Sequence, residues 1–184
     1  SKSGIDSNTI SCIPNACDLE LFHPLPQNQV KKPQLIKGLD QSLEQDSFVA
    51  AFTGAHGLAN GLDAVLDTAA VLQKLGRDDI KILFIGDGRC KPLLERRVES
   101  EKLRNCHFLP PIPKLQLAEV LQRSVHVGLM VLDDVPAFYQ GTSPNKFFDY
   151  ISSGLPVVNN YPGWLAELIN DYCLGIAVSP RNSD

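Results

Sequence analysis

Between Thr142 and Asp149 the sequence places polar side chains of the kinds that bind anions and sugars. Thr142 and Ser143 stand in front of an expected helix, where free backbone N–H groups and the helix dipole attract a phosphate. Lys146 follows in the first turn and would add a positive charge. Asp149, one turn later, could accept hydrogen bonds from two sugar hydroxyls. An ordinary capped helix with a solvated lysine and a solvated aspartate fits the spacing equally well.

A second candidate site is the glycine-rich loop G-A-H-G-L-A-N-G over residues 54–61. Gly54 and Gly57 would let the backbone approach a phosphate closely. His56 could donate a hydrogen bond to a phosphate oxygen or to a sugar, and a solvated loop histidine is the competing interpretation. The glycine spacing is not the dinucleotide pattern G-x-G-x-x-G, and the sequence contains no G-K-[ST] of a P-loop.

Two further loops have the composition of turns that contact ligands. Gly86-Asp87-Gly88 follows an apolar run and fits either a ligand contact or a plain turn. The prolines at 110, 111 and 113 fix an extended edge against which a base could rest, although a rigid connecting loop explains them nearly as well. No Ser-His-Asp order and no cluster of metal ligands stands out, so neither a metal site nor a cofactor is predicted.

The apolar pattern predicts strands that alternate with helices. Continuous apolar runs predict strands near residues 48–53, 80–85, 106–109, 125–132, 155–158 and 175–178. Helical spacing and end signals predict helices near residues 62–75, 92–103, 115–123, 144–153 and 163–170. Strands that are apolar throughout are typical of a parallel sheet covered on both faces. We therefore expect an α/β, Rossmann-like doubly wound domain, in which the candidate loops meet beyond the carboxyl ends of the strands.

Composition limits the class of protein. The 184 residues and the 43% share of hydrophobic residues predict one globular domain with a substantial core. A net charge of −4 with scattered Lys and Arg argues against nucleic acid as a partner. No apolar run is long enough to cross a membrane, and no signal peptide is visible. The five dispersed cysteines fit a reducing compartment, so we expect a cytoplasmic location.

Five stretches, in order, resemble the motifs of one enzyme family. Residues 13–24 (I-P-N-A-C-D-L-E-L-F-H-P) are similar to I-P-N-G-V-D-x-x-x-F-x-P, and residues 54–63 are similar to a G-x-x-x-x-x-K-G-x-x loop. Residues 84–88 (F-I-G-D-G) and 108–110 (F-L-P) resemble two strand ends, and residues 149–157 resemble E-A-x-x-x-G-x-P-V. The set resembles the C-terminal, nucleotide-sugar-binding half of GT-B glycosyltransferases of family 4.

This resemblance implies roles for individual residues. Asp149 stands where the family has the glutamate that binds the ribose hydroxyls of the nucleotide. The candidate catalytic residues are His56 and Lys146, near the phosphates or the transferred sugar. The other candidate residues for nucleotide-sugar binding are Gly54, Gly57, Asn60, Pro111, Ile112, Thr142, Ser143, Pro144 and Asn145. Of these, Ile112 would face the base, and the run from Thr142 onward would lie at the diphosphate.

The chain departs from the family pattern at two positions. The first glutamate of the family's pair is Gly141 here, and the usual lysine of the K-G loop is Asn60. Lys146 is the residue expected to supply the missing positive charge from another element. The form G-x-S-P-x-K-x-x-[DE]-Y resembles a subgroup that builds lipopolysaccharide O-antigen and capsule, including N-acetyl-L-fucosamine transferases. By that resemblance the donor is a UDP-linked amino sugar.

The resemblance implies retaining transfer from a nucleotide sugar without a bound metal. The substrate would lie between two domains, of which residues 48–184 would form the donor-binding one and residues 1–47 an N-terminal segment and surface arm. The acceptor domain would precede residue 1, so we expect this fragment to bind nucleotide and to transfer no sugar by itself. The implied acceptor is lipid-linked or saccharide, and the full-length enzyme could touch the inner face of the plasma membrane.

Three other functions compete with transfer. A nucleotide-sugar epimerase of GT-B architecture would need catalytic histidines and carboxylates, for which His56 is the main candidate. A dehydrogenase is disfavoured by the glycine spacing. A module that binds sugar nucleotides without catalysis is the third alternative.

Overall fold

The computed structural model describes Thr9, Ser11 and residues 13–26, 43–44, 46–139 and 141–180. These residues form a six-stranded sheet with the order β3-β2-β1-β4-β5-β6, in which every pair of neighbouring strands is parallel. The strands are β1 (Phe48–Thr53), β2 (Ile80–Ile85), β3 (Cys106–Leu109), β4 (Val127–Met130), β5 (Val157–Asn159) and β6 (Gly175–Ala177). The helices are α1 (Asp63–Lys74), α2 (Lys91–Glu101), α3 (Lys114–Ser124), α4 (Pro136–Tyr139), α5 (Asn145–Ser152) and α6 (Trp164–Asp171). The predicted doubly wound α/β fold is confirmed.

Two short elements were not predicted: the 3-10 turn η3 (Leu58–Asn60) and the single turn α4. The single turn α4 lies between the strand predicted near residues 125–132 and the helix predicted near residues 144–153. Tyr139 explains its presence, because the ring stacks on Tyr161 at 6.2 Å between centroids and the hydroxyl donates to Asp134. Among the described residues, no helix combines the length and the apolar character that a membrane-spanning helix needs.

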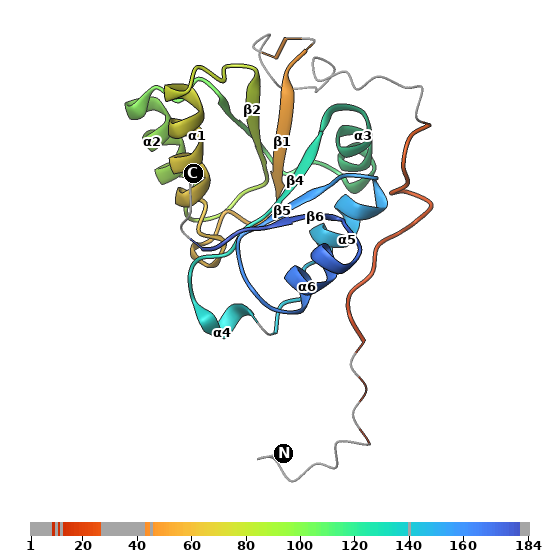
Figure 1. Cartoon of the computed structure of the whole chain (residues 1–184). Helices are drawn as coiled ribbons and strands as arrows, with labels where there is room; N and C mark the ends of the chain where they lie inside the picture. The colour runs from red at the N-terminus through yellow and green to blue at the C-terminus, as the bar shows by residue number, and fades with distance from the viewer. Residues whose placement is uncertain are drawn as a thin grey trace.

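The core lies on both sides of the sheet, because successive strand residues point to opposite faces. Along β1, Val49 and Ala51 belong to the cluster that α3, α5 and α6 cover. Ala50 and Phe52 belong to the cluster under α1 and α2. Figure 1 shows these two groups of helices on either side of the sheet.

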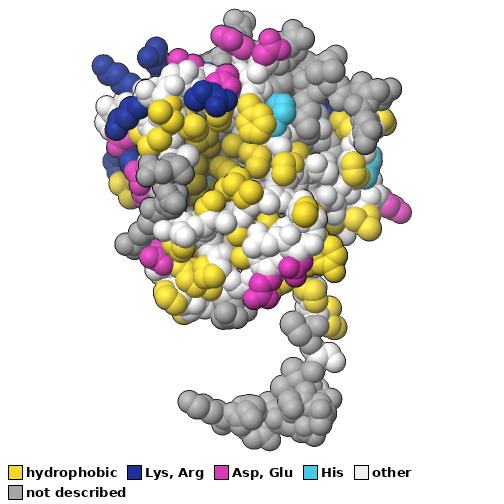
Figure 2. All heavy atoms as spheres, in the orientation of Figure 1, with side chains coloured by type: hydrophobic (Ala, Val, Ile, Leu, Met, Phe, Trp, Pro, Cys, Tyr) yellow, Lys and Arg dark blue, Asp and Glu magenta, His cyan; other side chains and the backbone are white. Residues whose placement is uncertain are grey.

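On the side of α1, part of the sheet is open in the described residues. A groove of about 290 Å³ runs beside α1 over residues of β1, β2, β4, β5 and β6. Its exposed apolar side chains include Phe48 and Ile176, at 42% and 57% exposure. Figure 2 shows hydrophobic side chains gathered in this hollow. The continuous helical cover expected on both faces is therefore present on one side and partial on the other.

The N-terminal segment, over residues 13–26, runs along the α3, α5 and α6 side of the domain (Figure 1). Asn15 donates from its backbone N–H to the hydroxyl of Ser143, at 2.9 Å. Phe22 is fully buried in the core, and Gln122 of α3 donates to the carbonyl of Leu21 at 2.9 Å. This part of the segment is thus packed on the domain, whereas residues 27–42 of the expected surface arm lie outside the described residues. The domain boundary near residue 47 stays a prediction.

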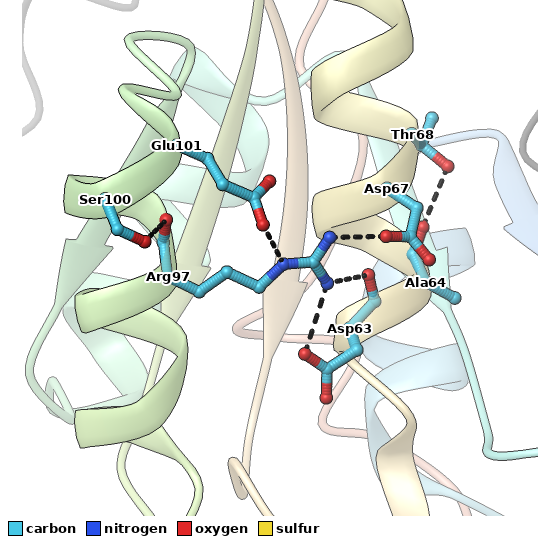
Figure 3. A network of polar contacts seen from close by, with 7 residues as sticks. All are labelled: Asp63, Ala64, Asp67, Thr68, Arg97, Ser100 and Glu101. Carbon is cyan, nitrogen blue, oxygen red and sulfur yellow. Dashed lines mark hydrogen bonds and ion pairs between the residues drawn. The ribbon is translucent and has the colours of Figure 1, made fainter.

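Arg97 joins α1 and α2, which lie on the opposite side of the sheet from the N-terminal segment (Figure 3). Arg97 of α2 donates to Glu101, one turn along its own helix, at 2.7 Å. The same guanidinium reaches across to α1, where it binds Asp67 and both the carboxylate and the carbonyl of Asp63. These carboxylates raise the pKa of Arg97, so the network is charged at every physiological pH. It links α1 and α2 through one guanidinium group.

We expect Arg97→Met to lower the free energy of unfolding by about 1 kcal/mol, because a network of partly exposed ion pairs is lost. The measurement is the urea midpoint at low and at high salt, and the loss should shrink at high salt. Arg96→Met is the matched control, since Arg96 is an exposed neighbour on the same helix. Equal effects of the two substitutions would contradict the role of the network.

Candidate functional site

A pocket of about 480 Å³ opens where the first three strands end at their carboxyl side. Such edges are where parallel α/β sheets bind ligands. The pocket is lined by Thr53, Gly54, Ala55, Ile85, Gly86, Asp87, Pro111, Ile112, Leu117, Asn145, Lys146 and Asp149. Six of the residues predicted from the sequence therefore come together here: Gly54, Pro111, Ile112, Asn145, Lys146 and Asp149.

The floor of the pocket is backbone. Gly54 donates from its N–H to the carbonyl of Ile85 at 2.9 Å, which brings the ends of β1 and β2 together. Gly86 has φ +145°, and a Cβ on it would lie 1.9 Å from the carbonyl oxygen of Gly54. Only glycine fits this contact, because any side chain at 86 would drive the two strand ends apart. The close contact leaves the floor flat and free of side chains.

Asp149 contributes a buried carboxylate to the pocket. Its side chain is 8% exposed, and Oδ1 lies 3.8 Å from Nζ of Lys114, which is too long for a hydrogen bond. Burial raises the pKa of the Asp149 carboxyl, and the nearby Lys114 opposes that rise. Oδ1 has no hydrogen-bond partner in the described part of the chain. The carboxylate can therefore accept hydrogen bonds from a ligand at little cost to other contacts.

Lys146 lies on the same helix, one turn before Asp149. Its ammonium group stands over the ring of Phe52, 3.7 Å from the ring centre. The same Nζ would be 3.5 Å from a Cβ placed on Gly54, so the lysine borders the floor of the pocket. Burial lowers the pKa of Lys146 to about 7. A lysine with this pKa gains or loses its charge near neutral pH, and a bound anion would favour the charged form.

Tyr150 holds α5 in place above the pocket. The side chain is fully buried, and its hydroxyl lies 2.9 Å from the backbone N of Thr53 and 3.0 Å from the Thr53 hydroxyl. The ring fits against β4 because residue 128 is glycine: a Cβ there would lie 2.4 Å from the Tyr150 ring. A glycine inside an apolar strand is a sequence signal for such close packing. α5 is thereby fixed against the end of β1.

His56 does not line the pocket, contrary to the prediction. The ring is fully buried, and its centroid lies 5.9 Å from Phe52, 6.2 Å from Phe84 and 5.9 Å from Phe108. Burial lowers the pKa of His56 to about 4, so the imidazole is neutral. Its two nitrogens have no hydrogen-bond partner in the described residues. The expected role of His56 as a donor to phosphate or sugar is incompatible with this position.

Two residues of the glycine loop also lie away from the pocket. Asn60 donates from its amide to the carbonyl of Ala55 at 2.7 Å, which braces the loop internally. Gly57 lines a separate hollow of about 310 Å³ beside α1, together with Asp63 and Asp133. The loop therefore offers Gly54 and Ala55 to the pocket, and neither Gly57 nor Asn60 lines it.

Residues 142–144, which directly precede α5, are held by hydrogen bonds from neighbouring elements. The carbonyl of Thr142 accepts a hydrogen bond from the indole of Trp164 at 2.9 Å. The Ser143 hydroxyl accepts from the backbone N–H of Asn15 and does not cap the helix: the N-cap is Pro144, with no side-chain cap bond. Thr142, Ser143 and Pro144 are not among the residues that line the pocket. The diphosphate contacts expected of these three residues stay a prediction.

Comparison with protein families gives a clear assignment. The family described as "Glycosyl transferases group 1" matches residues 47–184, three quarters of the chain. The chain belongs to the glycosyl transferases of group 1. No curated protein matches the sequence.

Solved structures share the fold of this group 1 domain at low identity. The C-terminal domain of LpcC, a glycosyl transferase group 1 family protein from Francisella tularensis, has a TM-score of 0.64 at 17% identity over 91% of this chain and 82% of that one. Anabaena HepE, solved with UDP and glucose, has a TM-score of 0.69 at 17% identity over 99% of this chain and 46% of that one. WaaG, a glycosyltransferase involved in lipopolysaccharide biosynthesis, has a TM-score of 0.59 at 16% identity over 82% of this chain and 41% of that one. This chain therefore spans less than half of HepE and of WaaG. The shared fold is that of the C-terminal domain of GT-B glycosyltransferases.

Sequence reasoning missed Leu117 and Lys114 at the site of this group 1 domain, and it left Asp87 open between a ligand contact and a plain turn. Asp87 and Leu117 line the pocket, and Lys114 faces Asp149 from the first turn of α3. The place of Asp87 directly after β2, at the edge of the sheet where ligands bind, favours the ligand contact over the plain turn. For Lys114 the signal was a cation at the start of a helix, where the dipole favours anions.

We expect Tyr150→Phe to lower the free energy of unfolding of this group 1 domain by about 1–3 kcal/mol, because the buried N–H of Thr53 loses its acceptor. The measurement is urea unfolding followed by circular dichroism. Tyr172→Phe is the matched control, since Tyr172 is 70% exposed. A stability of Tyr150→Phe equal to that of the control would show that the hydroxyl contact does not hold α5.

Proposed function

We propose that the chain is the donor-binding half of a retaining glycosyltransferase of family 4, and that the pocket holds the nucleoside diphosphate of its sugar donor. The observation that carries this proposal is the convergence of Asp149 and Lys146 on a side-chain-free floor at the strand ends. A buried acceptor for hydroxyls and a cation for phosphates, within one turn of one helix, match the two ends of a ribose diphosphate. Membership of the group 1 family supports the same reading.

The pocket suggests how a nucleotide would lie. The base would rest on Pro111 and Ile112, which form one apolar wall. The ribose hydroxyls would donate to Asp149. The diphosphate would lie over Gly54, near Asn145 at the start of α5, where the backbone N–H groups and the helix dipole favour an anion.

The chemical role of the domain would be to stabilise the departing diphosphate. Lys146 and the start of α5 would place positive charge where negative charge grows as the sugar leaves, without a metal ion. Lys146 then takes the part of the lysine that is Asn60 here, and the acceptor hydroxyl would come from a substrate bound to the preceding domain. Transfer therefore needs both domains.

We further propose a UDP-linked amino sugar as donor and a lipopolysaccharide or other polysaccharide as acceptor. This proposal rests on the resemblance of residues 141–150 to O-antigen and N-acetyl-L-fucosamine transferases. UDP in the HepE structure and the part of WaaG in lipopolysaccharide biosynthesis support it. The enzyme would act in the cytoplasm, at the inner face of the plasma membrane. The epimerase alternative loses its main candidate, because His56 is buried away from the pocket.

We expect the chain to bind UDP in preference to GDP and ADP in calorimetric titrations, and Asp149→Asn to weaken UDP binding by about 1–3 kcal/mol. The physical reason is the loss of a charged acceptor for the ribose hydroxyls. Asp171→Asn, at the exposed end of α6, is the matched control. Preference for GDP would overturn the UDP assignment. Equal affinity of the two variants, with the fold intact, would overturn the ribose contact.

We expect nucleotide binding to take up about one proton per site at pH 8. Lys146 has a pKa of about 7 in the free protein, so it is mostly neutral at pH 8, and a bound diphosphate would raise that pKa. Affinity should accordingly fall as the pH rises above 7. The measurement is the UDP-binding heat at pH 8 in two buffers with different ionisation enthalpies, where the nucleotide phosphate is already ionised. Lys146→Met should remove the difference between buffers, and equal heats for the unsubstituted protein would contradict the assignment.

A further inference from the structure

Lys114 and Asp149 face each other across the junction of α3 and α5. Nζ of Lys114 is 3.8 Å from Oδ1 of Asp149, and the two side chains are 53% and 8% exposed. The ammonium also lies over the ring of Phe22, 5.2 Å from the ring centre. Phe22 belongs to the N-terminal segment and is fully buried. A half-exposed lysine is thus placed between a buried aromatic ring and a buried carboxylate.

The position of Lys114 runs against local helix preference. Lys114 is the first residue of α3, where the helix dipole disfavours a cation. Local rules are broken most often where a function offsets the cost. Here the ion pair is poor in geometry and half in solvent, so it adds little to stability. The main effect of the ion pair is on the ionisation of the Asp149 carboxyl.

Few charged groups surround the Asp149 carboxylate. Within the described residues, Lys114 from α3 is the one cation within 4 Å of it. Lys146 from the same helix and Asp87 from the loop after β2 line the same pocket. Burial raises the pKa of Asp149, and Lys114 is the charge that opposes the rise. An ionised carboxylate accepts two hydroxyl donors, whereas a protonated one keeps a proton of its own to donate.

We propose that Lys114 is a positioning residue of the nucleotide pocket, which keeps the Asp149 carboxylate ionised and free to accept the sugar hydroxyls of a bound nucleotide. The proposal rests on the function proposed above and adds a residue from another helix to its site. Lys114 acts through Asp149. Its removal should therefore change the pH dependence of binding more than the binding at high pH.

The first test needs no ligand. The pKa of the Asp149 carboxyl is measured by NMR titration in the unsubstituted chain and in Lys114→Met. An opposite charge at this distance shifts a carboxyl pKa by about one unit or more, so the substitution should raise the pKa of Asp149 by at least that amount. Lys114→Arg, which keeps the charge, should leave the pKa near its original value. The same pKa in Lys114→Met and the unsubstituted chain would overturn the proposal.

The second test is the affinity for UDP between pH 8 and pH 5. As the pH is lowered, UDP binding to Lys114→Met should begin to weaken about one pH unit higher than binding to the unsubstituted chain. At acidic pH the variant should therefore bind UDP about tenfold more weakly than the unsubstituted chain. Lys74→Met, at the exposed end of α1, is the matched control and should follow the unsubstituted profile. In an Asp149→Asn background, Lys114→Met should change the affinity less than twofold, since the group that it acts through is gone.

The outcomes separate this inference from the proposed function. UDP binding with identical pH profiles for Lys114→Met and Lys74→Met would overturn the role of Lys114 and leave the nucleotide site standing. A full effect of Lys114→Met in the Asp149→Asn background would show that Lys114 touches the nucleotide directly, which also overturns the inference. No binding of UDP by the unsubstituted chain would overturn the proposed function, and the carboxyl titration would still decide the effect of Lys114 on Asp149.

Discussion

The buried hydroxyl of Tyr150 holds α5 against the end of β1, and the geometry of the pocket depends on that contact. Asp149 directly precedes Tyr150, and Lys146 lies one turn earlier. Fixing the tyrosine therefore fixes the carboxylate and the ammonium relative to the strand ends. The contact itself requires glycine at 128, because the ring occupies the space that a Cβ would fill. Gly128 of β4 and Tyr150 of α5 thus set the position of the site together.

The pocket buries an acidic group, Asp149, and a basic group, Lys146, and burial shifts the pKa of both. Burial raises the pKa of the Asp149 carboxyl and lowers that of the Lys146 ammonium, so each group is pushed toward its neutral form. The nearest opposite charge to Asp149 is Lys114, which belongs to α3 and not to the turn that carries Lys146. Lys146 packs on the face of Phe52 instead. A ligand with hydroxyl donors at one end and an anion at the other would stabilise both charged forms at once.

The buried position of His56 shows why the direction of a loop side chain is hard to predict from a sequence. In the parallel register Phe52 pairs with Phe84, and Phe84 pairs with Phe108. This pairing puts three phenylalanine rings in a row on one face, and His56 turns inward to pack on them. Each phenylalanine was recognisable from the sequence as an apolar strand residue. Their alignment depends on the register between strands, which no local pattern encodes.

The sequence by itself determined the strands and helices, the parallel doubly wound fold and the edge of the sheet where the candidate site lies. Those properties follow from local periodicity, glycines and prolines, which act within a few residues. Only the tertiary structure decided which polar side chains face the pocket: it kept Lys146 and Asp149 and turned His56 and Asn60 away. It also placed Lys114 against Asp149. The physical reason is that these choices depend on packing between residues far apart in the chain, such as Phe22, Lys114 and Asp149.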